Sequence, residues 1–233
     1  MPKPRDCPFY YVCALDEVNC TECSKTGMNY LATHVYLKKA GMPPAYLPGN
    51  VHPGDIIRIQ GSGFRAYVRE LTQRVDNGEG AFIYSRTTGN GKTTVGCALL
   101  LKYLYHTAGR FITTDVDTPV AYINVVDYLE TLRREMNNPS DWMTRFMELQ
   151  FSPTTAPALL LLDDIGAEKP SDWVKERLYS LINFRVNHKL ATIYTSNCTP
   201  EELQDTLGSR IYSRIVGSTI QVPFKGTDHR VGG

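Results

Sequence analysis

The chain has 233 residues, of which 42% are hydrophobic and 21% are charged, so it can bury the core of one medium-sized domain with a small appendage. Its formal net charge of +1 at pH 7 excludes a strongly basic surface overall, and any nucleic-acid site must therefore be local. No run approaches the ~18 apolar residues of a membrane span, and the start lacks a signal-peptide apolar region, so we expect a cytoplasmic protein that does not contact membranes.

The first 50 residues are predicted to form a region of their own, and residues 51–233 the main domain. A proline- and glycine-rich segment, 41–53, reads as the linker. The N-terminal region holds four cysteines, and only the last two have the C-x-x-C spacing of a zinc knuckle. A region this short has too little core to fold alone, which favours a structural Zn²⁺ over free cysteines packed on the main domain. The predicted ligands are Cys7, Cys13, Cys20 and Cys23, with His34 as an alternative to one of them.

The stretch 81–94, AFIYSRTTGNGKTT, has the order strand, glycine-bearing loop, Gly-Lys-Thr and helix, which is typical of a phosphate-binding loop. Its lysine is expected to reach the β- and γ-phosphates of a nucleotide, and the threonine after it to bind Mg²⁺. The helix N-terminus adds partial positive charge. The predicted nucleotide-binding residues are Thr87, Thr88, Gly89, Asn90, Gly91, Lys92, Thr93 and Thr94.

One position departs from the G-x-x-x-x-G-K-S/T pattern, because its first glycine falls on Arg86. That glycine mostly serves the turn that leaves the strand, so arginine in its place is expected to affect the geometry of the loop more than its contact with phosphate. The alternative is a chance Gly-Lys-Thr at the start of an ordinary helix.

A further helix is predicted before the phosphate-loop strand, and another after a predicted strand over 120–126. Apolar residues at helical spacing predict a helix over 64–75 that ends at Asn77-Gly78. The helix after the strand carries Arg133 and Arg134. Arginines beside aromatic residues can bind single-stranded DNA, although packing is the simpler account of the aromatics.

Acidic and amide side chains end the next two predicted strands. The run ALLLLDDIG, 158–166, reads as a strand buried on both faces that ends in Asp163 and Asp164. Carboxylates there lie where open α/β sheets bind ligands, so Asp163 is expected to bind Mg²⁺ and Asp164 to polarise the attacking water. Strand 191–197 ends in Asn197, which can orient a water or contact the γ-phosphate; an ordinary Ser-Asn turn is the alternative.

Helical segments lie on either side of the last of these strands. The segment 173–188 is predicted to be a helix before it, and Pro200 to begin another after it. Two arginines then lie four residues apart on one face of a predicted helix, in LGSRIYSRI, and these are Arg210 and Arg214. A last strand, 219–222, precedes the tail GTDHRVGG, which contains Arg230.

These motifs, in this order and spacing, resemble the DnaC/DnaI-type helicase loaders, which are AAA+ ATPases related to the transposition helper IstB. The resemblance covers about residues 55–230. It implies an α/β AAA+ P-loop domain with a parallel sheet flanked by helices. Matched residue by residue, it implies Walker A at Lys92 and Thr93, Walker B at Asp163 and Asp164, sensor 1 at Asn197, an arginine finger acting in trans at Arg214 with Arg210 as its companion, and sensor 2 at Arg230.

The resemblance also implies a function. It predicts a weak ATPase, stimulated by DNA and assembly, that uses ATP and Mg²⁺, assembles with itself on single-stranded DNA and delivers a DnaB-type replicative helicase. In this family the N-terminal region contacts the helicase and, in the DnaI branch, carries zinc.

Two alternatives remain open. An IstB-like transposition helper is the main one, and the zinc-like N-terminus argues against it. A small-molecule kinase is the other, but it has no use for Arg210 and Arg214.

Overall fold

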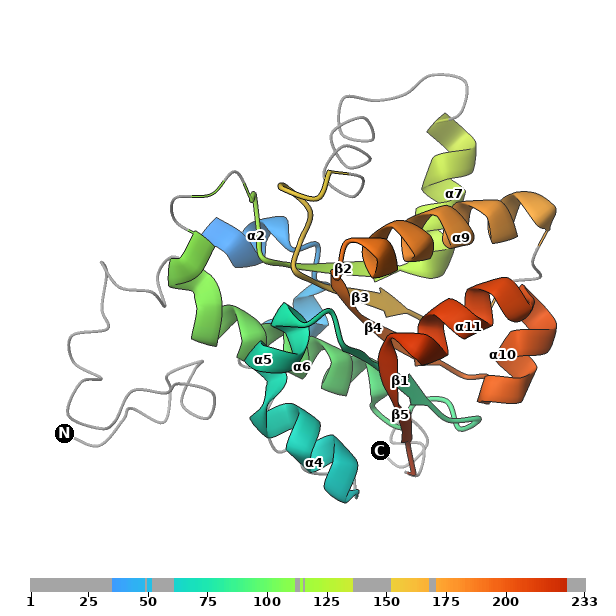
Figure 1. Cartoon of the computed structure of the whole chain (residues 1–233), viewed down its shortest axis with the longest axis horizontal. Coiled ribbons are helices and arrows are strands. Elements are labelled where there is room, and N and C mark those ends of the chain that lie inside the picture. The colour runs from blue at the N-terminus through green and yellow to red at the C-terminus, as the bar shows by residue number, and fades with distance from the viewer. Residues whose placement is uncertain are drawn as a thin grey trace.

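Five parallel strands form one sheet at the centre of the domain, as Figure 1 shows. The computed structural model describes residues 35–48, 50–51, 61–111, 114, 116–135, 152–167 and 171–225. The strand order is β2-β3-β4-β1-β5. The bounds are β1 (Gly80–Tyr84), β2 (Val120–Asn124), β3 (Leu159–Asp163), β4 (Ala191–Ser196) and β5 (Thr219–Pro223). All strands run in the same direction, so their carboxyl ends meet at one edge of the sheet.

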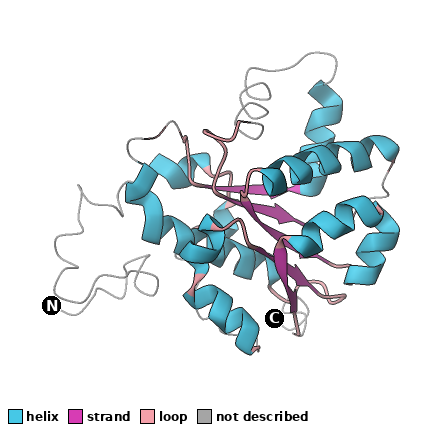
Figure 2. Ribbon diagram, viewed as in Figure 1, coloured by secondary structure: helices cyan, strands magenta, loops and turns pink. Residues whose placement is uncertain are grey.

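Helices cover both faces of the sheet (Figures 1 and 2). One face is covered by α4 (Ser62–Arg69), α5 (Leu71–Asp76) and α6 (Lys92–Thr107). The other is covered by α7 (Val125–Glu135), α9 (Asp172–Asn187), α10 (Pro200–Leu207) and α11 (Ser209–Gly217). The remaining short elements are α2 (Leu37–Lys39), η3 (Pro44–Tyr46) and η4 (Ala108–Phe111).

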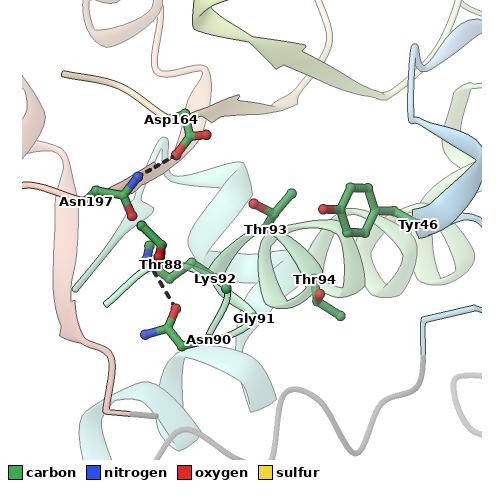
Figure 3. A pocket seen from close by; sticks show the side chains of 10 residues that line it. Tyr46, Thr88, Asn90, Gly91, Lys92, Thr93, Thr94, Asp164 and Asn197 are labelled. Atoms are coloured by element: carbon green, nitrogen blue, oxygen red, sulfur yellow. Dashed lines mark hydrogen bonds between the residues drawn. The ribbon is translucent and has the colours of Figure 1, made fainter. Parts of the chain in front are cut away.

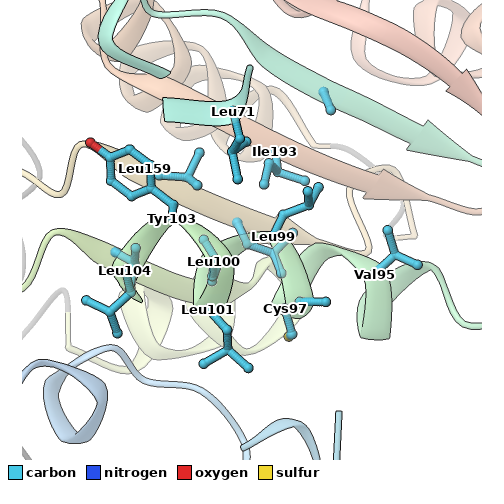
Figure 4. Close-up of a cluster of buried hydrophobic side chains, with 14 of the residues drawn as sticks. Leu71, Val95, Cys97, Leu99, Leu100, Leu101, Tyr103, Leu104, Leu159 and Ile193 are labelled. Atoms are coloured by element: carbon cyan, nitrogen blue, oxygen red, sulfur yellow. The ribbon is translucent and has the colours of Figure 1, made fainter. Parts of the chain in front are cut away.

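The strands divide their apolar side chains between the two faces because successive residues of a strand point in opposite directions. In β3, Leu159 and Leu161 pack with α6, whereas Leu160 and Leu162 pack with α9 and α11. Figure 4 shows α6 lying against the sheet, with its leucines buried. The continuous apolar run of β3 is therefore explained by burial on both faces, as predicted.

Several predicted elements have different bounds in the structure, and three of these differences have a local conformational cause. The predicted strand 120–126 ends at Asn124, because the Asn124 side chain accepts hydrogen bonds from the backbone N–H groups of Val126 and Asp127 at the start of α7. The predicted helix 64–75 is divided into α4 and α5 at Glu70, whose φ is −96° and ψ 13°. The strand predicted over 158–166 is β3, which ends at Asp163; Asp164 follows it with a φ of 61°.

Part of the segment predicted as a linker packs on the main domain. Met42 and Val51, and Ala40 just before the segment, are buried in the same apolar cluster as α6. The backbone N–H of Tyr122, on edge strand β2, donates to the carbonyl of Ala40 at 2.7 Å. The described residues of segment 35–51, which are 35–48 and 50–51, therefore dock along the β2 edge, and the domain boundary at residue 50 stays a prediction.

The four predicted zinc ligands, His34 and Arg230 lie outside the described residues. Within the described ranges, no group of three or more His, Cys, Asp or Glu side chains is arranged to hold a metal ion. No helix in those ranges is long and apolar enough to cross a membrane.

Candidate functional site

The predicted phosphate loop connects the carboxyl end of β1 to the first residue of α6. Gly89 and Gly91 have φ values of 65° and 99°, in the left-handed region that favours glycine. A Cβ added at Gly91 would meet nothing within 4 Å, so glycine is needed there for its backbone conformation and not for space. Gly91 is also the N-cap of α6, so the first N–H groups of that helix, which have no intrahelical acceptor, lie at the end of the loop.

Lys92 is buried in this loop and uses the loop's own oxygens as partners. Its exposed fraction is 6%. The ammonium donates to the carbonyl of Thr87 at 2.8 Å, to Oδ1 of Asn90 at 3.1 Å and to the carbonyl of Ser85 at 3.3 Å. A buried ammonium needs such partners, and the loop wraps around the charge.

Asp163, at the end of β3, is held by hydroxyl groups on both carboxylate oxygens. Oδ1 accepts from Thr93 at 2.8 Å and from Thr195 at 2.5 Å, and Oδ2 accepts from Tyr122 at 2.9 Å. Burial and the neighbouring Asp163 charge raise the pKa of the Tyr122 hydroxyl, which keeps it a hydrogen-bond donor. The structure therefore brings Thr93 and Asp163, the two predicted Mg²⁺ ligands, into direct contact.

Asp164 and Asn197 also meet at this edge. The Asn197 amide donates to Oδ1 of Asp164 at 3.1 Å, as Figure 3 shows. Asp164 has the left-handed backbone conformation that aspartate tolerates better than most residues. Its backbone N–H donates to Oγ1 of Thr195 at 3.0 Å. Thr195 thus fixes both acidic residues relative to each other.

A cavity of about 360 Å³ lies over these groups. It is lined by the loop from Thr88 to Thr94 together with Asp164 and Asn197. Tyr46 of η3 also lines it, and its hydroxyl points towards Thr93 in Figure 3. The docked segment 35–51 therefore contributes a side chain to the site.

Arg86, the departure from the loop pattern, does not strain the loop. It is not among the described non-glycine residues with positive φ, so its position does not require glycine. Its exposed guanidinium pairs with Oε1 of Glu202 on α10 at 2.8 Å. Glu202 also completes a capping box with Thr199 at the start of α10, and these bonds together with Arg86 lower the pKa of Glu202.

The predicted arginines lie away from the cavity lining. Arg210 is exposed and Arg214 half-exposed on α11, whose Ile211 and Ile215 are buried. Arg133 is exposed on α7, as is its neighbour Arg134; the Arg133 guanidinium lies 5.4 Å from the ring centroid of Trp173 on α9.

Sequence reasoning missed Tyr122, Thr195 and Tyr46. Thr195 directly precedes the Ser-Asn pair, but alternation along the strand gives only the sheet face of its side chain, and its contact with Asp163 depends on β4 lying beside β3. Tyr122 lies on the predicted strand next to β3, but strand order is not readable from one sequence. Tyr46 was placed in a linker, and no pattern in the sequence indicates its docking.

Comparisons with known proteins show which proteins the chain is similar to. No family model matches the chain. The replicative helicase loader DnaI of Bacillus subtilis (strain 168) is 32% identical over 84 residues, which are 36% of this chain and 26% of DnaI. The replicative helicase loader DnaC of Escherichia coli (strain K12) is 23% identical over 163 residues, 70% of this chain and 61% of DnaC. The matches thus span less than two thirds of the length of either relative.

Solved structures support the same assignment. The crystal structure of the DnaC helicase loader has a TM-score of 0.55 at 25% identity and covers 69% of this chain and 85% of its own. The replication initiator DnaA bound to AMPPCP and single-stranded DNA has a TM-score of 0.54 at 18% identity, covers 75% of this chain and 51% of its own, and shows likeness of fold alone. The parallel sheet flanked by helices matches the AAA+ domains of these proteins. In sequence and in fold the chain is similar to the DnaC/DnaI-type helicase loaders, which confirms the resemblance seen in its motifs.

Proposed function

We propose that this chain is an ATP-dependent helicase loader, which binds ATP and Mg²⁺, assembles with copies of itself on single-stranded DNA and delivers a DnaB-type replicative helicase. The observation that carries the proposal is the contact between Thr93 of the phosphate loop and Asp163, in a chain similar to helicase loaders. Asp164 and Asn197 meet beside this contact, at the same sheet edge.

The residues present fit a nucleotide and its metal. The Lys92 ammonium donates to loop carbonyls, and among the described residues it is the only cation that lines the cavity, where phosphate oxygens would compete for it. Thr93 and Asp163 offer the hard oxygen ligands that Mg²⁺ takes from proteins, usually one or two carboxylates beside phosphate oxygens. When bound, ATP with Mg²⁺ supplies a γ-phosphoryl group whose transfer to water releases the energy for remodelling. Asp164 and Asn197 would orient that water.

Hydrolysis would depend on a neighbouring subunit through Arg214. The described cavity lining includes neither Arg210 nor Arg214, and on α11 Arg210 is exposed and Arg214 half-exposed. A guanidinium that reaches a neighbour's γ-phosphate stabilises transition-state charge, an effect worth ~10³–10⁵ in rate for a true arginine finger. Loaders of this type turn over slowly, so we expect a smaller loss.

The trans role predicts the behaviour of mixtures. Arg214→Ala should bind nucleotide normally yet lose the hydrolysis stimulated by DNA and assembly. Mixing it with Lys92→Ala protein should recover part of that hydrolysis, since a mixed interface pairs an intact site with an intact finger. A mixture as inactive as its two components, beside active wild-type protein, would exclude action in trans.

The loading function is tested by co-purification with the replicative helicase of the host cell in the presence of ATP. Wild-type protein should retain the helicase, and Lys92→Ala should retain much less if the complex needs bound nucleotide. Capture of a transposase in place of the helicase would support the IstB-like alternative.

A further inference from the structure

A tyrosine on α9 contacts Arg210, the first of the two arginines of α11. The guanidinium carbon of Arg210 lies 4.4 Å from the ring centroid of Tyr179. This is within the ~6 Å at which a cation is attracted to the negative face of an aromatic ring. Tyr179 is half-buried, and its ring packs against the apolar cluster that α9 shares with α11. The ring is therefore held by the core on one side and faces Arg210 on the other.

The Tyr179 hydroxyl is influenced by both arginines. Hydrogen bonding and the charge of Arg210 lower the pKa of Tyr179, and Arg214 lowers it in the same way to a smaller extent. Two guanidiniums one helical turn apart repel each other and each has many rotamers. An electron-rich ring and a hydroxyl oxygen next to both lessen that repulsion and restrict the rotamers.

We propose that Tyr179 is a positioning residue that holds Arg210 and Arg214 in the geometry in which they meet the nucleotide of a neighbouring subunit. The proposal rests on the proposed function, because it assumes that Arg214 acts in trans. Tyr179 itself touches no reacting atom. Its role is to restrict the side-chain conformations of the arginines before the subunits assemble, so that less conformational entropy is lost at the subunit interface.

Two substitutions separate the ring from the hydroxyl. Tyr179→Leu keeps apolar bulk against the core but removes both the ring face and the oxygen, whereas Tyr179→Phe keeps the ring for Arg210. Tyr212→Leu is the matched control, since Tyr212 is also half-buried and lies on α11 itself. Tyr179→Leu should bind a fluorescent ATP analogue as wild type does, and should lose about threefold to tenfold of the assembly-stimulated hydrolysis. Tyr179→Phe should keep more than half of it, and Tyr212→Leu nearly all.

Mixing decides whether Tyr179 acts on its own site or on a neighbour's. Tyr179→Leu mixed with Lys92→Ala should recover hydrolysis, because the Lys92→Ala subunit supplies a well-held finger. Tyr179→Leu mixed with Arg214→Ala should not recover, because both lack a competent finger. Two results would overturn the positioning role alone. One is hydrolysis by Tyr179→Leu at the wild-type rate. The other is that Lys92→Ala restores hydrolysis when mixed with Arg214→Ala but not when mixed with Tyr179→Leu. Full hydrolysis by Arg214→Ala would overturn the trans mechanism and the positioning role together.

A second measurement does not depend on folding of Tyr179→Leu. The Tyr179 ring carbon can be followed by NMR in ¹³C-tyrosine-labelled protein across a pH titration, with Tyr179→Phe to assign its signal. Arg210→Ala should raise the pKa of Tyr179 towards its ordinary value, because the main group that lowers it is gone. An unchanged pKa would show that the contact does not form in solution and would overturn the proposal.

Discussion

Asp163 shows how much of the site depends on residues without charge. Hydroxyls from α6, β2 and β4 donate to its two oxygens, and together they fix a carboxylate that is only 3% exposed. Groups that orient a metal ligand in this way typically change metal affinity ~10–100-fold when removed.

Tyr122→Phe should therefore weaken the use of Mg²⁺ without unfolding the protein. We expect the Mg²⁺ concentration for half-maximal binding of a fluorescent ATP analogue to rise about tenfold, since Oδ2 of Asp163 loses its hydroxyl partner. Tyr67→Phe is the control, because Tyr67 donates to the carbonyl of Glu79 before β1 begins, at the far end of the strand from the site. Equal Mg²⁺ titrations for the two variants would mean that Tyr122 does not tune the metal site.

Lys92→Ala should abolish nucleotide binding in a folded protein. Within the described residues, no other cationic side chain lines the cavity. Lys102→Ala, on the same helix but outside the cavity lining, should bind as wild type does. Binding is measured by titration with the fluorescent analogue, and folding by circular dichroism. Near-native affinity in folded Lys92→Ala would remove the phosphate-loop assignment.

At the scale of elements, burial pattern predicted the sheet and the site better than it predicted element ends. The sequence indicates β1, β3 and β4 by their apolar runs and by the polar residues that follow them. A strand buried on both faces must be apolar at nearly every position, which makes its pattern easy to recognise. The end of β2 and the break between α4 and α5 were not readable, because each depends on one local conformation. Asn124 ends β2 by capping α7, and Glu70 interrupts an unbroken helical spacing.

Gly80 at the start of β1 is an element-scale requirement that hydrophobic pattern does not indicate. A Cβ there would lie 1.8 Å from the carbonyl oxygen of Thr192 on β4. Gly80→Ala should lower the free energy of unfolding by about 3 kcal/mol, since backbone and not a flexible side chain must move. Gly63→Ala, on α4 with nothing within 4 Å, should be neutral or stabilising. Urea denaturation of the two variants measures the difference, and similar midpoints would contradict the close approach of β1 and β4.

At the scale of the whole molecule, the two faces of the sheet have different surroundings. The α6 face is covered by α4, α5 and residues 35–51, which bring Tyr46 to the cavity. The other face carries α7, α9, α10 and α11, with the exposed arginines of α7 and α11. This layout was not predictable from the sequence, since docking of residues 35–51 on the β2 edge is a tertiary contact without local signal.

The exposed arginines of α7 lead to the last prediction, which concerns single-stranded DNA. Arg133 lies over Trp173, so a cation and an aromatic ring are combined at one place on the surface, as in proteins that bind single strands. Each phosphate contact to a single strand contributes ~0.7 to the slope of log K against log salt. If both arginines contact phosphates, replacing Arg133 and Arg134 by alanine should weaken binding and reduce that slope by about 1.4.

A matched pair of substitutions separates this surface from net charge. Arg65→Ala with Arg69→Ala removes the same two charges from α4, on the opposite face of the sheet, where both arginines are exposed. Binding of a labelled oligonucleotide is measured over a range of salt concentrations in the presence of ATP. The α4 pair should keep the wild-type slope, because charges far from the strand release no counterions from it. The double variant on α7 should instead show the slope reduced by about 1.4. Equal slopes for the two pairs would locate the DNA site elsewhere on the molecule, and a loss in both would mean that net charge, and not a local surface, controls binding.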